Sequence, residues 1–236
     1  MESESNNTVE TANAVPVNED IHASIGQEGD IDCFSFTLDT DAVVQPRLAF
    51  DPTDSNSRTY VLTLYGRNQT EMMKVNIGGK ESAKVIAPIA LKAGTYTVKV
   101  ENPRYIRQDY TLHLVCAAAE AVEQEPNDTA ALASELTVGV PLTGVLTTES
   151  DVDYFKVVFP ETTTATFRFT YPQSTTTGTV FAISVEQNGK SETLANLTGD
   201  SGGMEKSYKF MAGEYYLRVK AGSNWSGAVY TVGIEE

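Results

Sequence analysis

Hydrophobic and polar residues alternate along most of the chain with a period of two. The runs in which every second residue is hydrophobic are 33–38, 96–100, 110–114, 154–159 and 215–219. Such alternation is typical of antiparallel strands with one face in the core and the other in water. About eight short strands in each half of the chain fit a sandwich of two sheets. The pattern therefore predicts an all-β fold of two tandem jelly-roll-like antiparallel β-sandwiches, with helical turns only near residues 8–13 and 129–136.

The second half of the chain repeats the first at a nearly constant spacing. The aligned stretches are 2–8 with 123–129 and 30–34 with 151–155 at an offset of 121, then 93–100 with 212–219 at 119 and 109–112 with 229–232 at 120. A fixed internal period indicates a duplicated structural unit. We predict a first domain at 1–116, a short Ala-rich linker at 117–122 and a second domain at 123–236.

Composition narrows the function classes. The chain has 32 acidic and 17 basic residues, so its formal net charge is −15. This charge argues against binding a nucleic-acid backbone, and the apolar stretches are too short to insert into a membrane. The two histidines lie far apart, and no HExxH, CxxC or GxSxG motif is present. We therefore expect a binding or structural protein and not an enzyme. A hydrolase would need two carboxylates flanking a cleft, and nothing in the sequence beyond the acidic clusters described next offers such a pair.

Acidic and amide side chains recur at matched positions in both halves. The second half carries them at Glu123, Glu125, Asn127, Asp128, Asp151 and Asp153, and the first half at Glu2, Glu4, Asn6, Asn7, Asp30 and Asp32. If the two extended segments of each half meet, they supply five or six oxygen ligands, as Ca²⁺ prefers. Zinc is disfavoured because the clusters contain no Cys or His. The alternative is that these acids are solvated and keep strand edges from pairing.

The order of these motifs resembles the bacterial pre-peptidase C-terminal (PPC) domain. The resemblance rests on ExExND at the start, an Ala-rich turn, DxDYF, and a late AGxYxxxV followed by xYxxxI, and it covers both halves. It implies a jelly-roll sandwich, related to collagenase collagen-binding domains, that is commonly exported and non-catalytic. By position it implies Ca²⁺ ligands at Glu123, Glu125, Asn127, Asp128 and Asp153, with Asp151 beside them.

From this resemblance we expect a calcium-stabilised tandem module of an exported bacterial protein that serves targeting, tethering or surface binding. Its partner would be a protein or polysaccharide surface, or the rest of a larger parent protein. The expected location is secreted, periplasmic or at the cell surface, with no signal peptide in this chain. The alternative is a stand-alone surface adhesin or a domain that recognises carbohydrate or protein.

Two aromatic residues are candidates for ligand binding. Tyr216 occupies an outward position on a late strand, where collagen-binding relatives use tyrosine, but it also fits an ordinary sheet-face aromatic. Trp225, in a Gly/Ser-rich loop, either covers an edge of the core or marks a binding surface. Cys33 and Cys116 fall on opposite faces of their strands, so we expect no disulfide between them.

Overall fold

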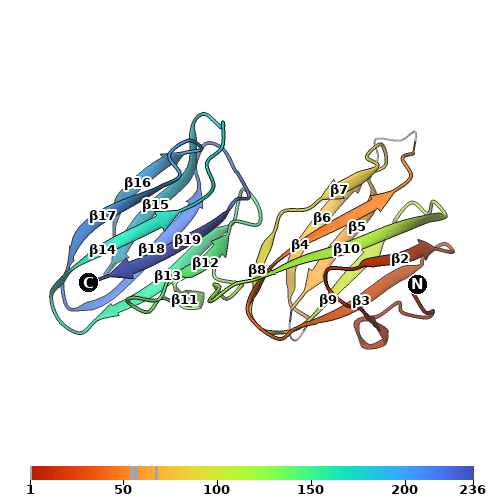
Figure 1. Cartoon of the computed structure of the whole chain (residues 1–236), viewed down its shortest axis with the longest axis horizontal. Coiled ribbons are helices and arrows are strands. Elements are labelled where there is room, and N and C mark those ends of the chain that lie inside the picture. The colour runs from red at the N-terminus through yellow and green to blue at the C-terminus, as the bar shows by residue number, and fades with distance from the viewer. Residues whose placement is uncertain (1, 54–57, 67–68) are drawn as a thin grey trace. The chain divides into compact units, whose positions relative to one another are not determined.

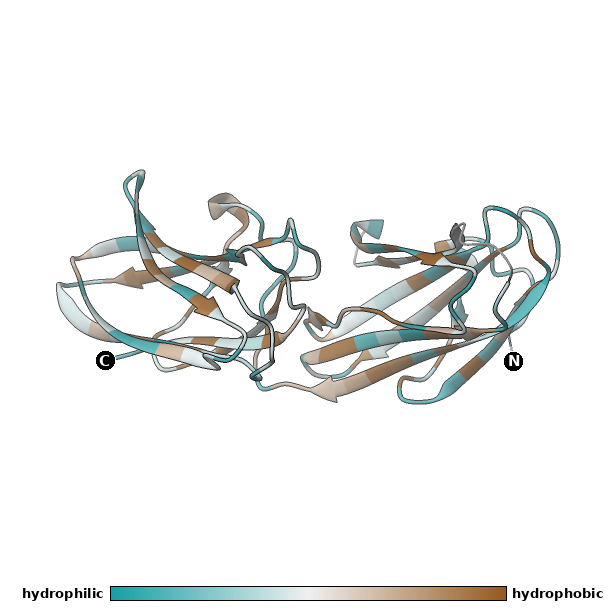
Figure 2. Cartoon of the chain, turned by 90° about the horizontal axis from the view of Figure 1, so that it is seen from above, coloured by the Kyte–Doolittle hydropathy of each residue, from teal (hydrophilic) through white to brown (hydrophobic). Residues whose placement is uncertain are grey.

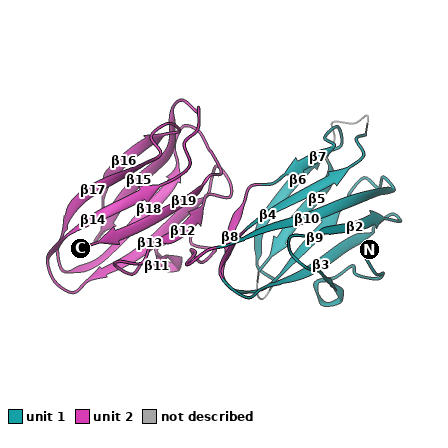
Figure 3. Cartoon of the chain, in the orientation of Figure 1, with its two compact units in different colours: residues 1–40, 44–86, 93–118 teal, residues 41–43, 87–92, 119–236 magenta. Residues whose placement is uncertain are grey.

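The computed structural model describes residues 2–53, 58–66 and 69–236 of the chain, which divides into two compact units. Unit 1 comprises residues 1–40, 44–86 and 93–118, and unit 2 comprises residues 41–43, 87–92 and 119–236 (Figure 3). Among the described residues, no helix is long and apolar enough to cross a membrane.

Strands dominate both units (Figure 1). Unit 1 contains η1 (Val9–Thr11), β1 (Asn13–Ala14), β2 (Asp20–Ile25), β3 (Ile31–Leu38), most of β4 (Ala42–Phe50), β5 (Arg58–Tyr65), β6 (Glu71–Gly78), β7 (Ala83–Val85), β9 (Gly94–Glu101) and β10 (Gln108–Ala118). Unit 2 contains β8 (Ile89–Leu91), η3 (Ala130–Leu132), β11 (Ser134–Glu135), β12 (Leu142–Val145), β13 (Val152–Phe159), β14 (Thr163–Thr170), β15 (Thr179–Gln187), β16 (Lys190–Thr198), β17 (Gly203–Phe210), β18 (Gly213–Ala221) and β19 (Val229–Glu235).

Each unit is built from two sheets. In unit 1 the strand orders are β1-β3-β9-β5-β6 and β2-β10-β4-β7. In unit 2 the orders are β11-β13-β18-β15-β16 and β12-β19-β14-β17. The predicted all-β sandwich class is therefore confirmed, although not every pairing is antiparallel. The two-residue strands β1 and β11 run parallel to β3 and β13, with Asn13 opposite Phe34 and Ser134 opposite Phe155.

Aromatic side chains join the two sheets of each sandwich. In unit 1 the ring of Tyr60 on β5 meets that of Tyr110 on β10 at 5.7 Å between centroids. In unit 2 Phe155 on β13 meets Tyr230 on β19 across the sheets at 6.3 Å, and within the sheet of β19 Phe169 on β14 stacks on Tyr230 at 4.8 Å. All five side chains are buried. Figure 2 shows the underlying alternation as bands of brown and teal along the strands. These contacts fix the positions of two tyrosines whose hydroxyls reach the acidic clusters.

The two cysteines are free. Cys33 falls on the outer face of β3 by its position in the alternation, yet it is fully buried. Its backbone N–H donates to the carbonyl of Asn6 at 3.0 Å, so the leading segment of the chain runs alongside this strand. Cys116 is partly exposed.

Candidate metal centre

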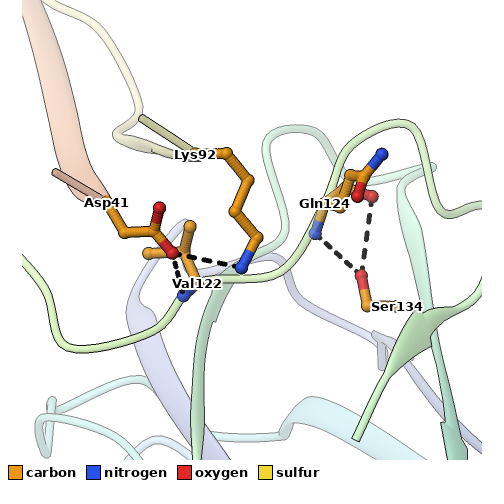
Figure 4. Close-up of polar contacts among 5 residues, drawn as sticks. All are labelled: Asp41, Lys92, Val122, Gln124 and Ser134. Atoms are coloured by element: carbon orange, nitrogen blue, oxygen red, sulfur yellow. Dashed lines mark hydrogen bonds and ion pairs between the residues drawn. The ribbon is translucent and has the colours of Figure 1, made fainter. Parts of the chain in front are cut away.

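The leading segment of unit 2 is held by hydrogen bonds on both sides of Glu123. Asp41 Oδ2 accepts hydrogen bonds from Lys92 Nζ at 3.1 Å and from the backbone N–H of Val122 at 3.4 Å (Figure 4). Further along, Ser134 Oγ accepts from the backbone N–H of Gln124 at 2.8 Å. These bonds hold the segment from Val122 onward in an extended path.

The same segment also bonds to the start of β13, where the second pair of acids lies. The backbone N–H of Tyr154 donates to the carbonyl of Asn127 at 3.1 Å. The backbone N–H of Glu123 donates to the carbonyl of Thr143 on β12 at 2.9 Å. Residues about 30 positions apart are therefore brought together by backbone pairing, and their side chains converge.

Three carboxylates meet at this point in unit 2. Oxygen atoms of Glu123, Glu125 and Asp153 all lie within 4.8 Å of one another. Glu123 Oε1 accepts from the backbone N–H of Val145 at 2.7 Å, and its Oε2 accepts from Asn127 Nδ2 at 3.1 Å. Asp153 Oδ2 accepts from the hydroxyl of Tyr230. We call Glu123, Glu125, Asn127 and Asp153 the unit 2 cluster.

Two buried oxygens of the unit 2 cluster lack a hydrogen-bond donor. Asn127 and Asp153 are both 0% exposed, yet Asn127 Oδ1 and Asp153 Oδ1 have no partner in the described part of the chain. An unpaired buried acceptor costs about 1–3 kcal/mol, and more when it is charged. These oxygens therefore fit the ligand set of a cation.

Asp151 and Asp128 lie at the edge of this cluster. Asp151 Oδ2 is already engaged by the backbone N–H of Thr147 at 2.6 Å and by its hydroxyl at 2.8 Å. The charge of exposed Asp128 helps to raise the pKa of Asp151, although burial is the larger cause. Neither residue belongs to the group of oxygens within 4.8 Å.

Unit 1 repeats this arrangement at matched positions. Oxygens of Glu2, Glu4 and Asp32 lie within 4.8 Å of one another. The hydroxyl of Tyr110 donates to Asp32 Oδ2 at 2.5 Å, as Tyr230 does to Asp153 in unit 2. We call Glu2, Glu4, Asn6 and Asp32 the unit 1 cluster.

The remaining contacts of unit 1 also match. Glu2 Oε1 accepts from the backbone N–H of Ser24 at 2.7 Å, and Asp30 Oδ2 accepts from that of Gly26 at 2.7 Å. Asp30 therefore stands beside the unit 1 cluster, as Asp151 does in unit 2. Four buried oxygens are without a partner among the described residues: Glu2 Oε2, Asn6 Oδ1, Asn7 Oδ1 and Asp32 Oδ1.

Burial raises the pKa of the clustered acids. It raises the pKa of Asp32 and of Glu125 to about 8 each. The pKa values of Glu123 and Asp153 are raised well above their ordinary range, first by burial and then by repulsion from neighbouring carboxylates. Buried like charges favour the protonated form unless a positive charge is present. Both clusters could therefore hold a metal ion, which would supply that charge.

The other predicted binding residues lie elsewhere. Tyr216 on β18 is half-buried, and its hydroxyl donates to Glu214. Trp225 is 40% exposed, and its indole N–H donates to the carbonyl of Leu146 at 2.8 Å. Neither residue belongs to an acidic cluster.

Sequence reasoning missed Tyr110 and Tyr230, the hydroxyl donors to the clusters. The available signal was a tyrosine repeated at the same point of the last strand in both halves, within Asp109–Leu112 and Val229–Val232. Because an inward tyrosine in an alternating strand also fits a simple core residue, the pattern did not single it out.

Comparisons with known proteins give structural neighbours only. No protein-family model and no curated protein matches the chain. The chain is similar to the pre-peptidase C-terminal domain of a collagenase from Bacillus anthracis, at 15% identity and a TM-score of 0.36, over 44% of this chain and 93% of that one. It is also similar to the CUB1-EGF-CUB2 domains of rat MASP-1, at 9% identity and a TM-score of 0.30, over 95% of this chain and 100% of that one. A third neighbour is Paenibacillus xanthan lyase, at 15% identity and a TM-score of 0.29, over 91% of this chain and 25% of that one.

Proposed function

We propose that this chain is a non-catalytic binding module, stabilised by Ca²⁺, of an exported bacterial protein. It serves to target, tether or attach that protein to a protein or polysaccharide surface. The observation that carries the proposal is the presence of unpartnered buried oxygens at matched positions of both units, on Asp32 and Asp153 above all.

The donor chemistry favours calcium over other metals. Every side chain of the two clusters offers an oxygen, from a carboxylate or an amide, and none offers nitrogen of His or sulfur of Cys. Calcium takes six to eight such oxygens in flexible geometry, whereas magnesium demands a near-octahedral shell and keeps several waters. Glu2, Glu4, Asn6 and Asp32 would hold one ion, and Glu123, Glu125, Asn127 and Asp153 the other.

Each ion would act as a clip. It would join the leading segment of a unit, which carries the two Glu residues, to the strand that carries the Asp. In its absence the buried carboxylates are stable only when protonated, because burial and mutual repulsion oppose their charge. At a free ion concentration about 100 times Kd, such a clip adds about 2.7 kcal/mol to the free energy of unfolding.

We further propose that the two units are copies of one domain, with the first at 1–116, a linker at 117–122 and the second at 123–236. The strand orders of the two units correspond one to one along the chain, from β1-β3-β9-β5-β6 to β11-β13-β18-β15-β16. The strand registers correspond as well. Ala23 pairs with Tyr110 in unit 1, and Gly144 pairs with Tyr230 in unit 2. One ancestral site would then have been inherited twice.

The direct test is thermal unfolding in excess EDTA and in millimolar Ca²⁺, with Mg²⁺ as the control. We expect the melting temperature to rise by about 10 °C or more with calcium and to stay nearly unchanged with magnesium. Equal stability in EDTA and in calcium would overturn the proposal and leave the clustered acids as buried, hydrogen-bonded groups without a metal.

A further inference from the structure

A groove of about 840 Å³ lies on unit 1 beside its acidic cluster. Its walls come from β2 and β10, from the end of β4 with the following turn, and from the leading segment that carries Glu2 and Glu4. Ligand sites are commonly concave and of this size. Nothing in the calcium clip requires an open cavity here, so the groove calls for its own explanation.

Negative charge dominates the lining of the groove. Its carboxylates are Glu2, Glu4, Asp51 and Asp109, and no Lys or Arg is among its described lining residues. The cluster residue Asp32 adds a fifth carboxylate behind Glu2 and Glu4. With a bound Ca²⁺ counted, these five carboxylates still leave a local charge of −3. Such a groove concentrates cations and repels anions.

The buried Asp32 links the charge to the cavity. It is 0% exposed, and its Oδ1 is unpartnered among the described residues. Its Oδ2 accepts from Tyr110, which lines the groove, and the cluster places it within 4.8 Å of oxygens of the two lining glutamates. Asp32 does not itself line the groove; it belongs to the unit 1 cluster, and its charge reaches the groove through the two lining glutamates and Tyr110.

The floor of the groove is apolar. Phe50 and Tyr110 lie there with 7% and 3% of their surface exposed, beside Ala23, Ala49 and Pro52. An apolar floor beneath an acidic rim suits a side chain with an aliphatic stem and a cationic head, because lysine buries its methylenes while its ammonium stays near charge and water.

Unit 2 lacks the groove-specific residues. At the position of Asp109 it has Val229, and at the position of His22 it has Thr143. The clip-forming Glu and Asp residues are present in both units, whereas this rim acid is present in one. The rim acid Asp109 is therefore specific to unit 1 and is not part of the shared metal-binding arrangement.

We propose that the unit 1 groove binds a lysine-bearing segment of a partner polypeptide. Asp51 and Asp109 would meet the ammonium group, and Phe50 and Tyr110 would support its stem. The calcium-holding wall formed by Glu2 and Glu4 rests on the function proposed above, but the rim acids are independent of it.

The test uses the full chain in millimolar Ca²⁺ and a fluorescent hexalysine peptide, with binding followed by anisotropy. The double variant Asp51→Asn/Asp109→Asn should weaken binding about five- to tenfold, as expected for two exposed ion pairs. The matched control is Asp39→Asn/Glu71→Gln, which removes the same charge from exposed sites of unit 1 outside the groove. We expect this control to bind like the wild type.

Several outcomes would overturn the groove proposal. Equal weakening in both double variants would mean attraction by the net charge alone. Calcium-dependent binding of a hexaglutamate peptide, with none of hexalysine, would mean that the metal itself recognises a carboxylate. Absence of hexalysine binding, together with a calcium-induced rise in melting temperature, would refute the groove and leave the calcium clip standing. Groove-dependent hexalysine binding, together with a melting temperature that calcium does not change, would support the groove and refute the clip.

Discussion

Replacing Asp153 by Asn should abolish the stabilisation of unit 2 by calcium. Asp153 is fully buried, with Oδ2 bonded to Tyr230 and Oδ1 unpartnered in the described structure. Asn has the same shape and resembles the protonated acid, which is the form that burial favours in the absence of metal. The variant should therefore fold normally in EDTA, and it should lack the charge that draws calcium into the unit 2 cluster.

The expected size follows from linkage. At a calcium concentration about 100 times Kd, the wild-type unit gains about 2.7 kcal/mol. A domain of roughly 100 residues shifts its melting temperature by about 4–8 °C per kcal/mol, so the wild-type shift should be about 10–20 °C. In the Asp153→Asn variant we expect a shift of less than about 2 °C.

Trp225 makes the assay specific for unit 2. It is the single tryptophan of the chain, and its indole N–H donates to Leu146 within that unit. Its fluorescence therefore follows the unfolding of unit 2. Glu149→Gln is the matched control, since Glu149 is exposed and lies two residues before Asp151. A full calcium shift of the tryptophan signal in Asp153→Asn would refute the assigned ligand set.

Two further predictions follow from the same structure. In EDTA the free energy of unfolding should fall as the pH rises from about 4 to about 8. Asp32 and Glu125 have pKa values near 8 in the folded state and near 4 in the unfolded state, so the folded state holds more protons in this range. Thermal unfolding measured across this pH range would contradict the prediction if stability stayed constant or rose. A thiol reagent should modify Cys116 in the native protein and Cys33 only after unfolding. Cys33 is fully buried, and burial raises the pKa of its thiol to about 11. Two fast-reacting thiols in the native state would contradict this prediction.

The strands were predictable because the sandwich leaves one face of most strands in water. Runs such as Phe34–Leu38 show the difference between the two faces as an alternation of hydrophobic and polar residues. The short strands Asn13–Ala14 and Ser134–Glu135 were not predictable, since two residues are too few to show a period. Their parallel pairing depends on how the leading segment of each unit packs against β3 or β13, and a local sequence pattern does not contain this information.

The acids of the site were predictable from their recurrence, but their separate roles were not. The alternate spacing of Asp151 and Asp153 in the sequence predicts that both lie on one side of a strand. In the structure β13 begins only at Val152, and Asp151 turns to accept two hydrogen bonds from Thr147. Asp153 instead points into the interior and meets Tyr230, a residue 77 positions away. Contacts across that distance are set by the packing of the two sheets.

The two clusters differ in charge at one matched position, and a substitution there should have opposite effects on stability in EDTA and in calcium. Asn7 stands where unit 2 has Asp128, and its buried Oδ1 has no partner in the described part of the chain. The substitution Asn7→Asp adds a negative charge beside the unit 1 cluster, so it should lower the melting temperature in EDTA through repulsion. With calcium present the same charge should tighten binding to unit 1 by about tenfold, or about 1.4 kcal/mol.

Titration calorimetry of wild type and variant measures this change, and Asn188→Asp serves as the control. Asn188 is an exposed turn residue of unit 2 with a φ of 50°, a conformation that Asp also tolerates. The control should leave both calcium affinities unchanged. If Asn7→Asp left the affinity of unit 1 unchanged while destabilising the metal-free protein, Asn7 would be a neighbour of the acids and not a ligand. We expect the variant to be less stable than the wild type without calcium and more stable with it only if the added charge faces the ion.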